Sequence, residues 1–512
     1  MILKLKFLAA ASAIALVNMA APAAAQHMHM PGMTMPAAPK PAAKKPAEKA
    51  RPKKKAAAKH AGKARAAKPA ASPPKSGESM PPMDHGAMPM PPQSEPPAPE
   101  PMDHSQMNHG PMNMSAGDHA RHMAMSGALG PYPMERESSG TAWQPDASEH
   151  QGLMIKSGDW MLMAHGVLNL VYDHQSGRRG DDQAFASGML MGMAQRPLGN
   201  GTLQFKAMIS PDPLMGSRGY PLLLASGEPA NGRVRLIDRQ HPHDFFMELS
   251  ASVSQNIGPR SSVFVYAGLP GEPAFGPPAF MHREAILDSP EAPISHHWLD
   301  STHISFGVVT AGIVLDRVKL EVSRFNGREP DQHRWNIETG PLDSTAIRLS
   351  WNPTRELSLQ GSWGHFTDPE QLEPGVDQKR WSASALYARE IARGWKLAGT
   401  LAWGRKSAEH HDDDAYVAEA SLKHEAWTLF GRGEITENRE LLDTEEHGPA
   451  FRVGKVSAGA VRDFRIGKNL SFGAGGLFAV NFVPRGLEPL YGSRNPTGMM
   501  AFARLKLDGG GM

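Results

Sequence analysis

From about Trp160 onward, apolar and polar residues alternate along the chain with a period of two. This pattern is typical of half-buried β-strands, because successive side chains of a strand point to opposite faces. The rows recur almost to the last residues. Apolar members of these rows include Trp160, Leu162, Leu168, Leu203, Phe205, Met247, Leu249, Leu357, Leu359, Trp395, Leu397, Leu470 and Phe472.

The expected connections between these strands alternate between short and long. Short turns are expected near 197–201, 258–261, 315–317, 353–355, 392–394, 424–426 and 466–469. Long loops are expected near 173–183, 211–244, 270–302, 328–343, 367–379, 406–413, 438–450 and 484–496. In an up-and-down barrel, such alternation puts every long loop on one rim and every short turn on the other.

We therefore predict an all-β fold, a transmembrane up-and-down antiparallel β-barrel of about 14–16 strands over residues 151–512. Strands of about 10 residues match a tilted bilayer crossing. Aromatic residues at strand ends, such as Trp160 and Tyr172, are typical of membrane-interface girdles. The expected location is the outer membrane of a Gram-negative bacterium, in contact with its lipid. A secreted β-sandwich would also alternate, but it gives no reason for loop lengths to alternate.

Residues 1–25 have the features of a signal peptide. Lys4 and Lys6 precede an apolar stretch from Phe7 to Val17, which is too short for a stable spanning helix. Ala23, Ala24 and Ala25 offer a small-residue cleavage site. The mature chain is therefore expected to be exported.

Residues 26–150 are expected to form a disordered arm. Most of 36–101 is Pro, Ala, Lys and Ser, a composition that buries too little apolar surface to offset the entropy of ordering. The basic run around Lys53, Lys54 and Lys55 suits contact with anionic envelope polymers, and it serves equally well as a solubilising spacer. The whole chain carries a net charge of only +2, and no nucleic-acid partner is expected.

The arm is rich in methionine and histidine, and the chain has no cysteine. Thioethers are soft, uncharged ligands that favour Cu(I), or alternatively Ag(I), and imidazoles beside carboxylates add sites that suit Cu(II). The arm is therefore expected to bind copper in the periplasm. The candidate ligands there are Met28, Met30, Met33, Met35, Met83, His85, Met88, Met90, Met102, His104, Met107, His109, Met112, Met114, His119, His122, Met123 and Met125.

The repeated Met-Asp-His units at 83–85 and 102–104, with their flanking Met-x-Met pairs, resemble the leader of bacterial outer-membrane copper-resistance protein B. That family joins such a leader to a β-barrel and takes part in periplasmic copper tolerance. The resemblance covers about residues 80–125 and a general barrel architecture. It implies metal ions, and periplasmic copper carriers, as partners. The run from Arg239 to Asp244 also resembles uncharacterised outer-membrane proteins.

Three of the expected long loops contain closely spaced histidines. His241 and His243 flank a proline before Asp244, and further histidines follow at 282, 296, 297, 303 and 333. A His-x-His pair beside a carboxylate can bind Cu(II), Ni(II) or Zn(II). A structural, hydrogen-bonded turn explains the pair equally well.

Methionines also occupy one face of each of the first two expected strands, at Met161 and Met163 and at Met189, Met191 and Met193. Ordinary apolar packing accounts for such a row. A lumenal metal path is the alternative, because the first strand follows directly from the arm.

Three classes of function follow. The leading hypothesis is a protein of copper or silver tolerance that captures ions on its arm and anchors or exports them through the barrel. The second is a general porin with an incidental tail. An outer-membrane enzyme is the third, but no Gly-x-Ser-x-Gly motif occurs, so we expect no enzyme activity.

Overall fold

The structure is a computed structural model that describes residues 126–149, 152–409, 411–442 and 448–507. The predicted signal peptide and all the predicted metal ligands of the arm lie outside the described residues. The strands are β1 (Leu153–Ser157), β2 (Trp160–Gln175), β3 (Asp182–Leu198), β4 (Gly201–Ile209), β5 (Tyr220–Pro229), β6 (Arg235–Gln240), β7 (Phe246–Gly258), β8 (Ser261–Gly268), β9 (Val308–Leu315), β10 (Val318–Phe325), β11 (Ser344–Trp351), β12 (Leu357–Phe366), β13 (Gln378–Ala392), β14 (Trp395–Ala408), β15 (His411–His424), β16 (Trp427–Asn438), β17 (Phe451–Arg465), β18 (Leu470–Phe482) and β19 (Thr497–Leu507).

The helical elements are short and lie in the connections. They are η3 (Met134–Arg136), η4 (Asp212–Met215), η5 (Phe280–His282), α3 (His296–Leu299), η6 (Ser301–His303), η7 (Arg485–Leu487) and α4 (Glu488–Tyr491). Among the described residues, none of them has the length and apolar character needed to cross a bilayer.

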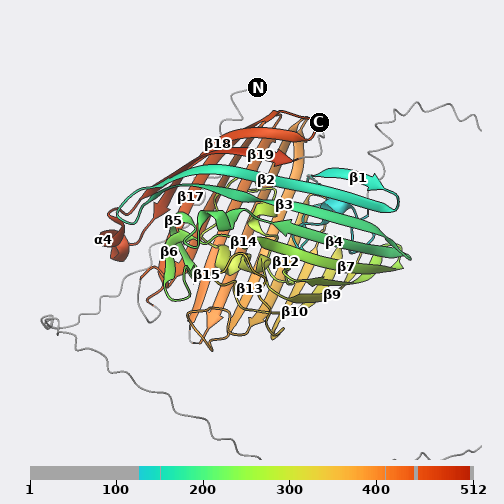
Figure 1. The fold of residues 1–512 in the computed structure, drawn as a ribbon, viewed down its shortest axis with the longest axis horizontal. Coiled ribbons are helices and arrows are strands. Elements are labelled where there is room, and N and C mark those ends of the chain that lie inside the picture. Colours follow the sequence, from blue (N-terminus) through green and yellow to red (C-terminus); the bar gives the residue numbers. More distant parts are fainter. Residues whose placement is uncertain (1–125, 150–151, 410, 443–447, 508–512) are drawn as a thin grey trace, which may run out of the picture. The chain divides into compact units, whose positions relative to one another are not determined.

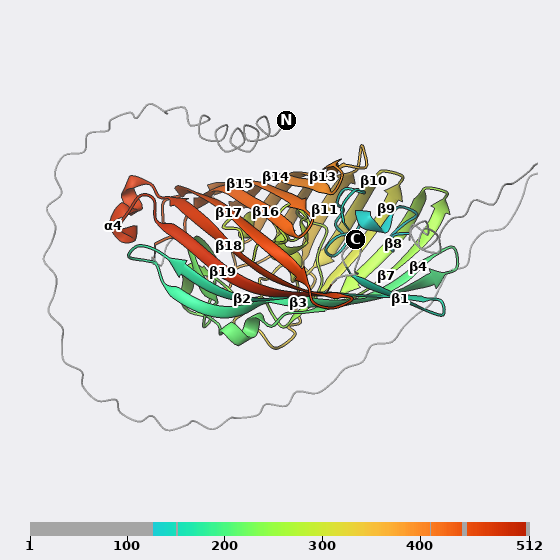
Figure 2. The same cartoon turned by 90° about the horizontal axis from the view of Figure 1, so that it is seen from above.

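Sixteen strands of the described residues form a closed antiparallel barrel (Figures 1 and 2). Consecutive strands pair from β2 through β4, and β4 then pairs with β7, because the β5–β6 hairpin lies outside the barrel sheet. Pairing continues to β19, which returns to β2 and closes the cylinder. The predicted fold and strand number are confirmed, and the predicted alternation of loop lengths holds except at the β14–β15 connection. Both the start of β2 and the end of β19 lie on the short-turn side, as expected.

β1 is an additional strand that the alternation did not predict. It pairs with Trp160–Ala164 at the start of β2, whereas β19 pairs with Gly166–Gln175 farther along. The two strands therefore share one edge of β2 end to end.

Side chains alternate between a buried lumenal face and an exposed outer face, as β10 illustrates. Lys319 and Glu321 are fully buried inside the barrel, while Leu320 and Val322 are 46% and 43% exposed on its outside. Leu170, Leu401 and Phe478 belong to the same apolar outer surface on other strands. An apolar exterior around a polar interior is the arrangement of outer-membrane barrels.

Two expected long loops are shorter than predicted. The β2–β3 connection covers only 176–181, and β14 and β15 are separated only by residues 409 and 410. The reason is that β2 and β3 have 16 and 17 residues and β14 and β15 have 14 each, so the paired strands continue beyond the length expected for a crossing.

Residues 126–149, which we call the N-terminal insert, correct the predicted boundary of the arm. They were expected to be disordered, but they lie inside the barrel at its short-turn end. Ser262 Oγ on β8 donates to the carbonyl oxygen of Leu129 at 2.6 Å, and Asn352 Nδ2 after β11 donates to that of Gln144 at 2.8 Å. Trp143 is only 3% exposed. These contacts order a segment that has no strand or helix periodicity of its own.

The β8–β9 connection, residues 269–307, also fills the lumen, and we call it the plug. Arg283 forms an ion pair of 2.7 Å with Glu419 on β15. Arg504 on β19 lies 2.6 Å from Asp288, and Ser295 Oγ donates to Glu434 on β16 at 2.8 Å. The plug therefore crosses from the β8–β9 side of the barrel to the opposite wall.

Candidate metal centre

Five histidines from two long connections meet inside the barrel. His241 and His243 follow β6 in the β4–β7 connection, and His296, His297 and His303 belong to the plug. Both connections lie on the long-loop side, as expected for this pair. The ring centroids lie 5.2 Å apart for His243 and His303, 5.3 Å for His296 and His303, 5.5 Å for His296 and His297, 5.6 Å for His241 and His297, and 5.8 Å for His241 and His296. We call these five residues the histidine centre.

An acceptor lies beside Nδ1 of every ring in the centre. Carboxylate oxygens lie 2.7 Å from that of His243 (Asp212), 2.8 Å from that of His296 (Asp300) and 3.3 Å from that of His297 (Glu329). Backbone oxygens lie 3.2 Å from that of His241 and 2.7 Å from that of His303. This network assigns a ring proton to each Nδ1, so that Nε2 carries the lone pair in every ring that is neutral.

Four of the Nε2 atoms are buried and have no hydrogen-bond partner, namely those of His241, His243, His296 and His303. His241 Nε2 lies 3.2 Å from Glu228 Oε1, but the pair does not have hydrogen-bond geometry. Buried polar atoms without a partner are rare, and a bound ion or water is a usual explanation. A histidine with one nitrogen held by a carboxylate or carbonyl and the other free has the arrangement of a metal ligand.

Burial also keeps most of these rings neutral. It lowers the pKa of His241 and of His303 well below the usual value, with nearby Arg334 adding to the effect at His241. Burial lowers the pKa of His296 as well, against the pull of Asp300. His297 differs, because Glu329 outweighs the effect of burial and raises its pKa. His297 is therefore suited to be a cation paired with Glu329, and the three rings with a lowered pKa are suited to be ligands.

Ion pairs hold the two connections in place around the centre. Arg334, from the β10–β11 connection, lies 3.1 Å from Asp244 and also pairs with Glu228 on β5. Arg380 on β13 lies 3.4 Å from Glu329. Gly227 lies against His297, and a Cβ at that position would come within 2.7 Å of Nε2. The rings are thus fixed from several sides of the barrel.

The five rings are gathered but not closed around one point. Among the described residues, no three histidine nitrogens lie within 4.8 Å of one another. Zinc or copper would hold its nitrogen ligands at about 2.0–2.1 Å. A bound ion would therefore draw at least one ring inward from the position described here.

The carboxylate oxygens of Glu370, Glu373 and Glu440 do lie within 4.8 Å of one another, beside a cavity of about 20 Å³. Lys406 Nζ lies 3.7 Å from Glu370, and Arg235 lies 2.7 Å from Glu373. These cations already balance the acidic group. We therefore interpret this acidic group as part of an ion-pair network with Lys406 and Arg235.

The histidines identified from the sequence fall into two groups in the structure, those inside the histidine centre and those outside it. His241 and His243 lie together with three plug histidines, and metal binding there stays a prediction. His333 is instead exposed and lies 2.9 Å from Asp331, outside the centre. His282 also lies in the plug but outside the centre. The charged groups that act on its ring are His165 on β2 and Lys206 on β4.

Sequence reasoning missed the carboxylates that lie beside the rings, chiefly Asp212, Glu228 and Glu329. Asp300 could have been found, because it lies four residues after His296 on a short helical segment, and residues at that spacing face each other. The other three lie 13 to 32 residues from their histidines, and only the folded loops bring them together.

No family model matches the chain, and no curated protein matches it. Similar solved structures include OmpF of Salmonella typhi in complex with daunomycin, which is 10% identical, with coverage of 69% of this chain and 100% of that one and a TM-score of 0.45. OprB of Pseudomonas putida at high pH is 10% identical, with 68% and 94% covered and a TM-score of 0.42. The anion-selective porin from Comamonas acidovorans is 12% identical, with 68% and 100% covered and a TM-score of 0.39.

Proposed function

We propose that this chain is an outer-membrane metal-handling barrel that receives a transition-metal ion, copper first and silver as the alternative, from its N-terminal arm. The histidine centre then holds the ion in the lumen. The single observation that carries the proposal is the set of three buried Nε2 atoms without partners, those of His243, His296 and His303, each on a ring whose Nδ1 faces an acceptor.

The donor set of the centre fits copper as it arrives from the arm, and it also fits Zn(II) and Ni(II). Neutral imidazoles suit all three metals, and histidine–carboxylate pairs raise the basicity of the ligands. The methionines of the arm instead suit Cu(I) and Ag(I). The chain therefore offers soft donors before the barrel and nitrogen donors inside it.

The expected orientation puts the arm on the periplasmic side. Outer-membrane barrels have short periplasmic turns and long extracellular loops. The N-terminal insert lies at the short-turn end, so the arm that precedes it would extend into the periplasm. Capture would then occur on the inner side of the membrane, with periplasmic copper carriers as possible donors to the arm.

A general porin is the second candidate, and the architecture favours it. The barrel has sixteen strands among the described residues and a lumen lined by charged side chains, both of which are porin features. The N-terminal insert and the plug occupy that lumen, however. Single-channel conductance of the purified barrel distinguishes the two candidates, because a porin should conduct steadily without any metal.

The proposal is tested by Cu(II) and Zn(II) binding to the purified full chain in detergent. The double variant His296→Ala/His303→Ala should lose a site of high affinity. The control His174→Ala/His424→Ala, which alters two partly exposed rings, should retain it. Equal binding by both variants would reject the histidine centre.

The arm is tested separately. Cu(I) is titrated into the peptide of residues 27–125 against a competing chelator, with a Met-to-Leu peptide as control. Binding no tighter than that of the control would remove the arm from the proposal. Unchanged growth under copper stress after deletion of 27–125 would favour the porin.

A further inference from the structure

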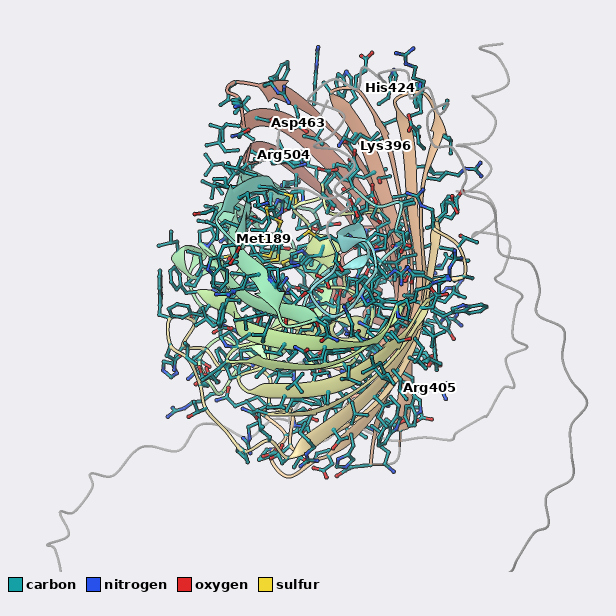
Figure 3. All side chains as sticks on the ribbon, turned by 90° about the vertical axis from the view of Figure 1, so that its right-hand side faces the viewer. Met189, Lys396, Arg405, His424, Asp463 and Arg504 are labelled. Carbon is teal, nitrogen blue, oxygen red and sulfur yellow. The ribbon has the colours of Figure 1, made fainter. Side chains whose placement is uncertain are left out.

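Methionines are concentrated on one part of the lumen wall. Met163 on β2 and Met193 on β3 are cross-strand partners, as are Met191 on β3 and Met208 on β4. Met189 and Met247 add further buried thioethers on β3 and β7. Figure 3 shows sulfur atoms gathered around the position of Met189.

The rest of the lumen wall is more mixed. Inward positions on other strands include buried charged residues, as at Glu321 on β10, Arg348 on β11 and Lys455 on β17, beside apolar residues such as Phe325 and Phe502. Barrel interiors are usually polar, and the apolar residues of such strands belong on the lipid side. The methionines are therefore on the face where membrane packing does not require them.

The thioethers form a continuous row between two functional segments. At the short-turn end, Met134 of the N-terminal insert packs with Met163 and Met193. Farther along, Met189, Met208 and Met247 pack with plug residues Ile304 and Phe306, and Met281 lies against them. Met191 contacts both groups. The row ends beside Ile304, the residue after His303 of the histidine centre.

Ordinary packing of the plug is the competing explanation. Methionine is flexible and fills irregular gaps, so an apolar seat for Ile304 and Phe306 would use it. Leucine or isoleucine would serve such a seat equally well, however, and six of the seven apolar wall residues in these two groups carry sulfur, Val167 being the exception. The side-chain amide of Gln204 donates to the sulfur of Met193 at 2.9 Å, so this thioether already acts as a Lewis base.

We propose that Met134, Met163, Met189, Met191, Met193, Met208, Met247 and Met281 form a binding path for soft monovalent ions, Cu(I) or Ag(I). The path leads from the N-terminal insert to the histidine centre. This inference rests on the proposed function and gives it a route. Transfer along the path is an exchange of one thioether ligand for the next, so the ion keeps its oxidation state and no proton is taken up or released.

The test uses the full chain labelled with [methyl-13C]methionine, in detergent and chloride-free buffer, with Ag(I) as the probe. Silver should shift the methyl resonances of Met163, Met189, Met191 and Met193. The resonance of Met499, a lipid-facing residue that is 47% exposed, is the internal control and should not move. Resonances are assigned by single Met→Leu substitutions, which keep the volume and leave the packing largely intact. Silver that shifts only arm methionines would overturn the proposal.

A second measurement, the number of silver and zinc ions bound per chain, applies even if single variants fold poorly. It also distinguishes failure of the path from failure of the histidine centre. The variant Met189→Leu/Met191→Leu/Met193→Leu should bind at least one silver ion fewer per chain than the wild type, yet retain its Zn(II) site. Loss of Zn(II) binding by His296→Ala/His303→Ala with unchanged silver shifts would support both proposals. No binding of either Cu(II) or Zn(II) by the wild type would reject the histidine centre alone. Equal silver stoichiometry of the methionine variant and the wild type would reject the path alone.

Discussion

Asp212 and His243 lie 31 residues apart in the chain, and Oδ2 of the first is 2.7 Å from Nδ1 of the second. The β5–β6 hairpin separates them in sequence, so this contact joins the two ends of the β4–β7 connection. The ring of His243 lies 5.2 Å from that of His303, centroid to centroid. The orientation of one candidate ligand therefore depends on a carboxylate at the end of β4.

Replacing that carboxylate should weaken metal binding without removing a ligand. Asp212→Asn should lower the affinity for Cu(II) or Zn(II) by about 10–100-fold, the usual effect of losing the partner that orients a ligating histidine. Isothermal titration of the purified chain measures it. The matched control is Asp182→Asn, which alters an exposed histidine–aspartate pair at His174. A loss of the same size in the control would point to a general effect of charge.

The plug should keep the barrel closed to ions. Glu291 pairs with Lys455 and lies 3.4 Å from Arg432, and all three side chains are fully buried or nearly so. Glu291→Ala would leave both cations without that partner, at a cost of about 3–5 kcal/mol in the free energy of unfolding. We expect low conductance for the wild type in planar bilayers and a higher, noisier conductance for the variant. Glu488→Ala, at an exposed position of α4, is the control and should behave like the wild type. A large, steady wild-type conductance would contradict this prediction.

The stability of the barrel should fall in acid through His282. Burial lowers the pKa of His282 to about 3, from 6.5 in the unfolded chain. Between these values the unfolded chain binds the proton and the folded chain does not, so the free energy of unfolding falls as the pH is lowered from 6.5. This one group contributes a slope of up to about 1.4 kcal/mol per pH unit. Urea unfolding at pH 7, 6, 5 and 4 should show a shallower slope for His282→Gln. His333→Gln, with its exposed ring, should match the wild type.

The N-terminal insert should contribute to stability in spite of its irregular backbone. Trp143 packs edge-on against Tyr132, and Arg136 lies over its ring at 4.7 Å. Trp143→Ala should therefore lower the free energy of unfolding by about 3–5 kcal/mol. Trp335→Ala, at a loop residue that is 56% exposed, should cost far less. Similar effects of both substitutions would mean that the insert is not part of the cooperative fold.

The barrel could be predicted from the sequence because each strand lies between two environments. Lipid on one side and charged lumen on the other impose the period of two, as Lys319, Leu320 and Glu321 illustrate. The lengths of some connections could not be predicted, because strands such as β14 keep their backbone pairing beyond the membrane. The N-terminal insert was missed for a different reason: Trp143 and Tyr132 are ordered by contacts with distant strands.

The histidine centre could be predicted only in part. The His-Pro-His run identified His241 and His243 as candidates, since the residue types and their spacing are local features. Their meeting with His296 and His303 depends on how the plug crosses the lumen, which long-range ion pairs such as Arg283 with Glu419 determine. The rows of methionine on β2 and β3 were visible in the sequence, whereas Met134 and Met281 join them only in the fold.

The N-terminal insert also constrains how the barrel is made. It precedes β1 in the chain, yet it lies within the cylinder that the seam between β2 and β19 completes. Assembly must therefore close the last seam around the beginning of the same polypeptide, or pull that beginning in after closure. In either order, closure of the barrel and placement of the N-terminal insert are linked. Correct assembly of the barrel therefore requires that the insert reach the lumen.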